Sequence, residues 1–149
     1  MKARETHESS ENYLESILML SKSRKVVRSI DIANMLSFSK PSVSVAMKRL
    51  REESLIAVDE NGYITLTPDG LQIATGIYEK HIVLTNLLVE LGVDAYTAGQ
   101  DACRIEHVLS PETFKKIKEY YLSHSSNSEK TLQQISGLSD PEHVIDKSK

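Results

Sequence analysis

The sequence predicts a mainly α-helical protein with one short β-hairpin. Apolar residues recur at helical spacing through most of the chain. Proline stands where a helix would begin at Pro41, Pro68 and Pro111, which is its favoured place in a first turn. An Asn61-Gly62 pair between two short apolar runs indicates a hairpin. Because two short helices precede that hairpin, the predicted fold is a winged helix-turn-helix with a larger helical part after it.

The predicted helix-turn-helix begins after a first helix at about residues 10–21. A second helix covers SIDIANML at 29–36, and SFSK makes a tight break before a third that begins near Pro41. Ser29 is expected to cap the second helix, and Ser39 or Lys40 the third. Inward-facing side chains are expected at Ile30, Ala33, Met35 and Leu36 on the second helix and at Val43, Ala46, Met47 and Leu50 on the third.

The hairpin lies in LIAVDENGYITLT, and the part after it reads as three more helices. The spacing predicts a long helix at about 68–91, a second at 94–109 and a third at 111–122. The chain after residue 123 is Ser-rich and weakly apolar. We expect a loosely held tail there, with at most a short helix that uses Leu132, Ile135 and Leu138.

Composition narrows the functional classes. No run of about 18 apolar residues exists, so we expect no membrane span. The N-terminus, MKARETHESSEN, has no apolar core after its charges, so we expect no secretory signal. The single cysteine excludes an internal disulfide and favours a reducing, cytoplasmic setting. A net charge of −3 argues against a nonspecific nucleic-acid coat.

Positive charge is nevertheless concentrated over the predicted helix-turn-helix. Lys22 to Arg51 holds eight basic residues, and Asp31 is the one acidic residue among them. This pattern is typical of a DNA-binding element on a mildly acidic protein, although a solvated helix surface or a winged helix used for protein contacts would also produce it. The start of the third helix, including Val43, would reach base edges, and later basic residues would touch phosphates. The DNA-binding candidates are Arg28, Ser39, Lys40, Pro41, Ser42, Ser44, Lys48 and Arg49.

The stretch DACRIEHVLS places Cys103, Glu106 and His107 at i, i+3 and i+4, which is one face of a helix. A metal site would need further donors, and Asn12, Glu15 and His81 lie on other predicted helices. Carboxylate and imidazole suit Fe(II) and Mn(II), whereas a thiolate shifts the preference toward softer ions.

Two other interpretations of this motif remain open. A Cys-His catalytic pair would need an oxyanion hole, and no glycine-rich loop supplies one. An ordinary helix would use Cys103 as a small core residue and leave Glu106 and His107 as surface or cap groups. For the motif alone, this last interpretation is the more common outcome.

Several segments together resemble the diphtheria-toxin-repressor family of metal-dependent transcription repressors, which includes iron repressors and manganese transport regulators. The resemblance covers about residues 10–122. It rests on ENYLESILML, SIDIANML, SKPSVSVAMKRL, ITLTPDG, EKH at 79–81 and DACRIEHVLS. It implies a homodimer in which a metal joins the first helix to the dimerisation helices. The implied metal ligands are Asn12, Glu15, His81, Cys103, Glu106 and His107.

The resemblance is a mixture of two types. Glu15 and His81 match the manganese type, Cys103 matches the iron type, and Asn12 matches neither. Members of the iron type have a second, ancillary metal site with Glu and His at two positions. The resemblance places Thr85 and Gly99 at these positions, so the ancillary site looks incomplete. From the length of the sequence we also expect none of the SH3-like domain that follows in iron repressors.

These observations predict a Mn(II)- or Fe(II)-responsive transcriptional repressor, not an enzyme, that controls metal-uptake genes. Its partners would be a palindromic double-stranded DNA operator and a second copy of the chain. The alternative is a winged-helix regulator that responds to a small ligand or to Cys103 oxidation. The expected parts are a winged helix-turn-helix DNA-binding domain at 1–70, a helical metal-binding and dimerisation domain at 71–123, and a polar C-terminal tail at 124–149.

Overall fold

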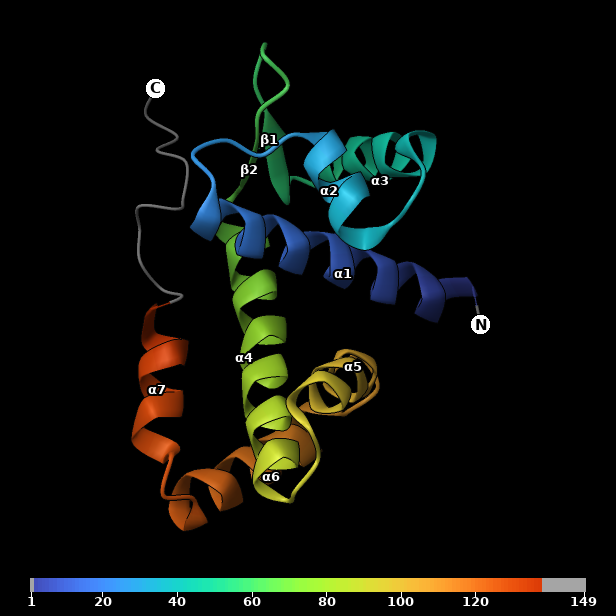
Figure 1. Ribbon diagram of the computed structural model, residues 1–149. Coiled ribbons are helices and arrows are strands. Elements are labelled where there is room, and N and C mark those ends of the chain that lie inside the picture. The colour runs from blue at the N-terminus through green and yellow to red at the C-terminus, as the bar shows by residue number, and fades with distance from the viewer. Residues whose placement is uncertain (1, 138–149) are drawn as a thin grey trace. The chain divides into compact units, whose positions relative to one another are not determined.

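The computed structural model describes residues 2–137, with side chains from residue 10, and is mainly helical (Figure 1). The described chain divides into two compact units, of which the first ends at Thr75 and the second begins at Gly76. The division falls inside the long helix α4, a few residues past the expected boundary. In chain order the elements are α1 (Lys2–Ser23), α2 (Ser29–Leu36), α3 (Lys40–Glu52), β1 (Ile56–Val58), β2 (Ile64–Leu66), α4 (Pro68–Glu90), α5 (Ala95–Ile105), α6 (Pro111–His124) and α7 (Ser128–Ser136).

The predicted helix-turn-helix is present, and its turn is set by local chemistry. Ser37 adopts a left-handed conformation with φ of 57° and ends α2. Ser39 then caps α3, because its hydroxyl accepts a hydrogen bond from the Ser42 backbone N–H at 3.3 Å. The cap of α2 is Arg28 rather than the expected Ser29, and the Asp31 carboxylate accepts a hydrogen bond from the Arg28 N–H at 2.9 Å.

The core of the first unit lies where α2, α3 and the hairpin pack on one side of α1 (Figure 1). All four expected inward residues of α3 are buried. On α2 the expectation is half wrong, because Ile30 and Met35 are exposed while Ile32 and Ala33 are buried. The buried residues of this core include Leu14, Ile17, Leu18, Ile32, Ala33, Val43, Ala46, Met47, Leu50, Ile56, Ile64 and Leu66.

The wing is the predicted two-stranded hairpin. Strands β1 and β2 pair antiparallel, with Ile56 opposite Leu66 and Val58 opposite Ile64. Gly62 supplies the positive φ of 80° that the turn requires. The Asp59 carboxylate accepts hydrogen bonds from the Asn61 and Tyr63 N–H groups at 2.8 and 2.9 Å, which rigidifies the tip.

The chain leaves the wing and enters α4 through a tight contact at Gly70. The Thr67 hydroxyl accepts from the Gly70 N–H at 3.1 Å and donates to the Ser54 carbonyl at 2.8 Å. A β-carbon added at Gly70 would lie 1.9 Å from the Leu55 carbonyl oxygen, so only glycine fits there. The start of α4 is therefore fixed on the backbone between α3 and the wing.

The second unit consists of the rest of α4 with α5, α6 and α7. Its apolar centre is Val83, Phe114 and Tyr121, joined by partly buried Leu87, Leu109, Ile117, Leu122 and Ile135. Helix α5 ends at Ile105, four residues before the predicted end at Leu109, so Glu106 and His107 lie in the turn that follows it.

The short helix considered for the tail is present, and residues 128–136 are held firmly. The buried Thr131 hydroxyl lies 3.0 Å from the Tyr121 hydroxyl and accepts from the Asn86 amide at 2.9 Å. These bonds fix α7 beside α6 and α4 (Figure 1). The expectation of a loosely held tail is wrong for this helix, and the remainder from residue 138 lies outside the described residues.

We predict that Gly70→Ala will destabilise the protein by about 1–3 kcal/mol, because its methyl group would overlap the Leu55 carbonyl. The matched control is Gly76→Ala, also in α4, where an added β-carbon meets no atom within 4 Å. That control should be neutral or more stable by up to about 1 kcal/mol. Urea unfolding followed by circular dichroism measures both, and equal midpoints for the two variants would contradict the prediction.

Candidate metal centre and DNA-binding face

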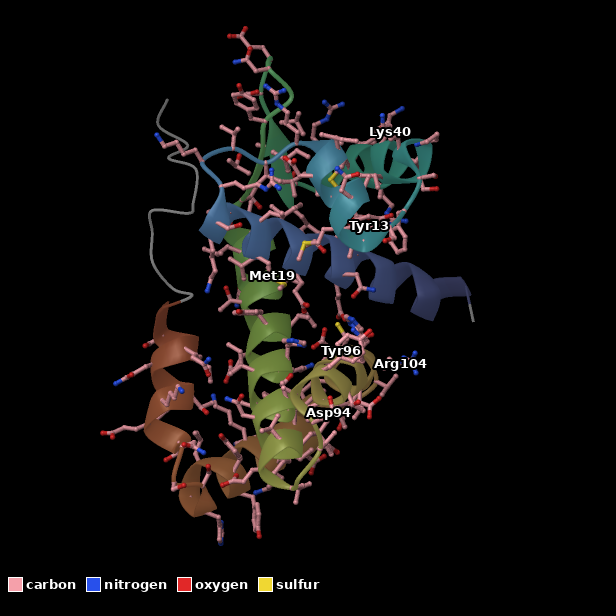
Figure 2. All side chains as sticks on the ribbon, viewed as in Figure 1. Tyr13, Met19, Lys40, Asp94, Tyr96 and Arg104 are labelled. Carbon is pink, nitrogen blue, oxygen red and sulfur yellow. The ribbon has the colours of Figure 1, made fainter. Side chains whose placement is uncertain are left out.

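Helix α5 is the element that positions the candidate metal centre, and its start is capped by Asp94. The Asp94 carboxylate accepts hydrogen bonds from the Thr97 N–H at 3.1 Å and from the Thr97 hydroxyl at 2.5 Å. These hydrogen bonds hold the pKa of Asp94 below its ordinary value, because they favour the charged form. Ala98 and Ala102 are completely buried along one side of the helix. Figure 2 shows Asp94 and Arg104 on α5, with Arg104 extending away from α4.

Three of the predicted metal ligands meet within the second unit. His81 comes from α4, Cys103 from the last turn of α5, and Glu106 from the residue after α5. Their donor atoms lie within 4.8 Å of one another. The His81 Nδ1 atom is 3.1 Å from Glu106 Oε2. The i, i+3 spacing of Cys103 and Glu106 keeps their donor atoms close together, even though α5 ends between the two residues.

Glu106 is the most unusual member of the group, because its side chain is 0% exposed. His107 lies on its other side, with Nε2 3.5 Å from Glu106 Oε1, and its side chain is 6% exposed. Glu106 is therefore not a surface group, but it occupies the C-cap position of α5, which the interpretation as an ordinary helix had allowed. The alternative in which Cys103 is a core residue is wrong, since its thiol is free and exposed.

The ring of His81 is oriented by a neighbour that the sequence reasoning missed. Tyr78 stacks on it with ring centroids 6.3 Å apart and an interplanar angle of 13°. The sequence could have indicated this contact, because Tyr78 and His81 are three residues apart and such residues are neighbours on a helix. The Glu79 carboxylate, also on α4, pairs with Lys118 of α6. The EKH segment therefore ties α4 to α6 and presents the imidazole.

The donor set fits a divalent transition ion. Donors bonded to one ion at about 2.0–2.3 Å lie at most about 4.6 Å apart, so the three atoms are nearly within reach of a common ion. An imidazole nitrogen, a thiolate sulfur and a carboxylate oxygen are all ligands of such ions. A buried carboxylate is also the group whose desolvation an added cation would offset most.

The two remaining predicted ligands belong to the first unit. Asn12 and Glu15 stand one turn apart on α1, where Glu15 is buried and Asn12 is half-buried. The Asn12 carbonyl accepts a hydrogen bond from the Ser16 hydroxyl at 2.7 Å, as is common within a helix. Their participation in the metal site stays a prediction, as does that of His107.

The predicted DNA-binding residues divide into an exposed group and two that make contacts within the protein. Ser39, Lys40, Pro41, Ser42, Ser44 and Lys48 are exposed at the start and along α3. Figure 2 shows Lys40 on the side of α3 that faces away from α1. Cavities of about 260 and 220 Å³ flank this face beside Ser29, and Arg51 contributes to the second. Val43, expected among the base readers, is completely buried.

Arg28 and Arg49 make contacts inside the first unit. The Arg28 guanidinium lies 4.8 Å from the centre of the Tyr63 ring and donates to the Tyr63 hydroxyl at 3.1 Å, which joins α2 to the wing. The Arg49 Nη2 group donates to the Ser10 hydroxyl of α1 at 3.1 Å. Burial raises the pKa of Tyr13 beside it, and the positive charge of Arg49 opposes that rise.

Comparison with known proteins decides the family. Residues 5–69 match the N-terminal DNA binding domain of the iron dependent repressors, and residues 67–132 match their metal binding and dimerisation domain. This chain belongs to the iron dependent repressor family. The family consists of metal-dependent transcriptional repressors and not of enzymes, so the catalytic interpretation of Cys103 and His107 is set aside. The resemblance seen in the sequence is confirmed.

Individual relatives support the same assignment. The chain is 33% identical over 113 residues to the HTH-type transcriptional regulator MJ0568 of Methanocaldococcus jannaschii, covering 74% of this chain and 90% of that protein. It is 31% identical over 113 residues to the diphtheria toxin repressor of Corynebacterium glutamicum, covering 75% of this chain and 50% of that repressor. The solved structure of a manganese-dependent transcriptional repressor complex with manganese aligns with a TM-score of 0.69 and 26% identity, over 74% of this chain and 51% of the other. The chain thus spans about half the length of the latter two proteins.

Within residues 2–137, none of the helices combines the length and the apolar character that crossing a membrane would demand.

We predict that Asp94→Ala will lower the stability of the second unit at neutral pH, and that the deficit will shrink in acid. A carboxylate whose pKa is lowered by folding contributes stability above its ordinary value of 3.8, and this contribution disappears as the pH falls through the folded value. Urea midpoints of wild type and variant at pH 7, 5, 4 and 3 measure the difference. Asp101→Ala, which removes an exposed carboxylate from the middle of α5, is the control. A difference that stays constant with pH would contradict the prediction.

Proposed function

We propose that this chain is a Mn(II)- or Fe(II)-responsive repressor that binds palindromic operator DNA as a homodimer and controls metal-uptake genes. One observation supports the proposal most. A completely buried carboxylate, Glu106, faces His81, and the Cys103 thiol lies close to both. Such a donor group has little use in an ordinary helix pair but suits a regulatory ion.

The proposed ligands are His81, Cys103 and Glu106 in the second unit, joined by His107 and by Asn12 and Glu15 of α1. Carboxylate, amide and imidazole donors favour Mn(II) and Fe(II), while the thiolate of Cys103 makes the site softer. A solved relative is described as a complex with manganese, and another, ScaR, as bound to Zn²⁺. These relatives support a divalent ion here and leave its identity to experiment.

The DNA-binding part of the proposal relies on α3. Its exposed face offers lysine ammonium groups for phosphates and serine hydroxyls for base edges, in the orientation typical of a recognition helix. A single helix contacts only a few base pairs, so a dimer on a palindrome is the expected arrangement. The matched metal binding and dimerisation domain supports it. Arg28 and Arg49 are proposed to act mainly by positioning the wing and α1.

Metal and DNA binding are linked in this proposal. If the ion binds more tightly to the DNA-competent conformation, it must raise DNA affinity by the same factor.

The alternative, a switch that responds to oxidation of Cys103, is favoured by one observation, which is that the thiol is exposed. In that case Cys103→Ser would abolish the response and leave metal-free DNA binding intact.

We predict that the full-length chain will bind operator DNA tightly only when a divalent ion is present. Fluorescence anisotropy with a labelled palindromic duplex of the family type, in anaerobic buffer, should show weak binding with chelator. Mn(II) or Fe(II), added singly, should then tighten binding by at least about tenfold. Zn(II) and Co(II) serve as comparison ions, and a duplex of scrambled sequence controls for nonspecific association. Equal affinity with chelator and with every ion would overturn the metal switch.

Ligand variants should separate the proposed roles. Glu106→Gln, His81→Ala and Cys103→Ser are each expected to raise the Mn(II) concentration for half-maximal DNA binding by about tenfold or more, because each removes a donor. Glu15→Gln tests the contribution of α1 in the same titration. The control is Glu112→Gln, an exposed acid in the first turn of α6. A Glu15→Gln curve that superimposes on wild type would remove Glu15 from the site, and the same result for Glu106→Gln would overturn the proposed centre.

A further inference from the structure

The exposed face of α3 has a large apolar side chain at its centre. Val45 is 70% exposed, although α3 buries four other apolar residues, three of which are as large as valine or larger. Helical spacing places Val45 on a line with Pro41 one turn before it and Lys48 one turn after it. This line is opposite the buried side of the helix. Val45 therefore points away from the protein and is surrounded by polar groups.

The fold offers no reason for a valine at this position. A β-branched residue is a weaker helix former than most polar residues, and an exposed valine gains no burial. Single exposed apolar residues are common on protein surfaces, so exposure alone would decide nothing. Here the residue occupies the N-terminal half of the recognition helix, where side chains reach base edges. The polar neighbours Ser44 and Lys48 can hydrogen-bond to phosphates or bases, whereas Val45 can only make an apolar contact.

The major groove presents one apolar group, which is the 5-methyl group of thymine. We propose that Val45 contacts a thymine methyl group and so determines a preference for thymine in each operator half-site. The inference rests on the proposed DNA-binding function and makes it more specific. Val45 takes the reading role that the sequence had assigned to the buried Val43. The expected size of the effect is that of one methyl group in an apolar contact, about threefold to fourfold for each half-site.

The test compares thymine with deoxyuridine, which pairs identically but lacks the methyl group. A randomised duplex library is first enriched with wild-type protein and Mn(II), which yields a bound duplex whatever the operator sequence is. That duplex is then synthesised with deoxyuridine in place of each thymine in turn. Anisotropy titrations with saturating Mn(II) measure wild type, Val45→Ala and Val45→Thr on every duplex. Val26→Ala, which shortens an exposed valine before α2, is the matched control.

Wild type and the Val26→Ala control should lose about threefold to fourfold in affinity at one symmetry-related thymine, and about tenfold when both half-sites are replaced. Val45→Ala, which removes both γ-methyl groups and so shortens the side chain, should bind the thymine and deoxyuridine duplexes nearly equally. Val45→Thr, which keeps one γ-methyl group, should lie between. Thermal melting of each variant confirms that the fold is intact.

Two outcomes would overturn the inference. If no replacement discriminates wild type from Val45→Ala while DNA binding persists, Val45 does not read thymine and the proposed function still stands. If wild type enriches no duplex under any metal condition, the proposed function fails and the inference fails with it.

Discussion

Removing a carboxylate from water costs several kcal/mol unless its oxygens are hydrogen-bonded or faced by positive charge. Glu106 is placed under this constraint, because it is completely buried at the end of α5. Two imidazoles stand beside it, from His81 and His107. The Glu79 carboxylate of the same unit is in a different situation from Glu106. It is partly exposed and forms an ordinary ion pair with Lys118, which is also partly exposed. Glu106 is instead faced by two imidazoles and lies near an exposed thiol, and these are groups that can also bind a cation.

The sequence of α5 explains how these groups come together. The Asp94 cap and the buried Ala98 and Ala102 fix the start and the inner side of the helix. The last turn of α5 carries Cys103, and Glu106 follows it directly, so that both donor atoms lie close to His81 of α4. The helix then ends at once, so Glu106 lies in the cap position and His107 in the turn. A longer helix, as the sequence predicted, would have directed these side chains along one straight face.

The first unit shows how much of this fold local chemistry determines. The hairpin, the Ser39 cap and the inward face of α3 were predictable, because Asn-Gly turns, serine caps and helical periodicity depend on near neighbours in the chain. The predictions were wrong where contacts between distant parts of the chain determine which side chains are buried or paired. Ile30 and Met35 fit an apolar helical face but are exposed, since α2 packs through Ile32 and Ala33. Arg49 has the charge of a phosphate ligand, yet its partner Ser10 is 39 residues away.

The candidate site was predictable for a different reason. Three donor types at helical spacing point to a shared face, but the pairing of α5 with His81 of α4 came from the family resemblance rather than from spacing. The docking of α7 was missed because part of it depends on Thr131 and Asn86, two polar residues that carry no hydrophobic signal. Val45 was missed because periodicity identifies which residues face inward and gives no measure of how far an outward residue is exposed.

The proposed donor set combines nitrogen, oxygen and sulfur atoms, and this mixture limits how the centre could distinguish Mn(II) or Fe(II) from Zn(II). Affinity for nitrogen, oxygen and sulfur ligands generally rises from Mn(II) through Fe(II) to the later transition metals. A site containing Cys103 and His81 will therefore bind Zn(II) at least as tightly as Mn(II), and affinity alone cannot make it a manganese or iron sensor. Discrimination must come from the conformation that each ion stabilises, since an ion raises DNA affinity only by its preference for the DNA-competent state. A four-coordinate ion could be satisfied by the donors of the second unit with one more group, whereas an ion that requires six ligands would have to recruit others. In the proposed centre, the number of ligands that an ion demands, rather than the strength with which it binds, would then be the property that is converted into DNA affinity.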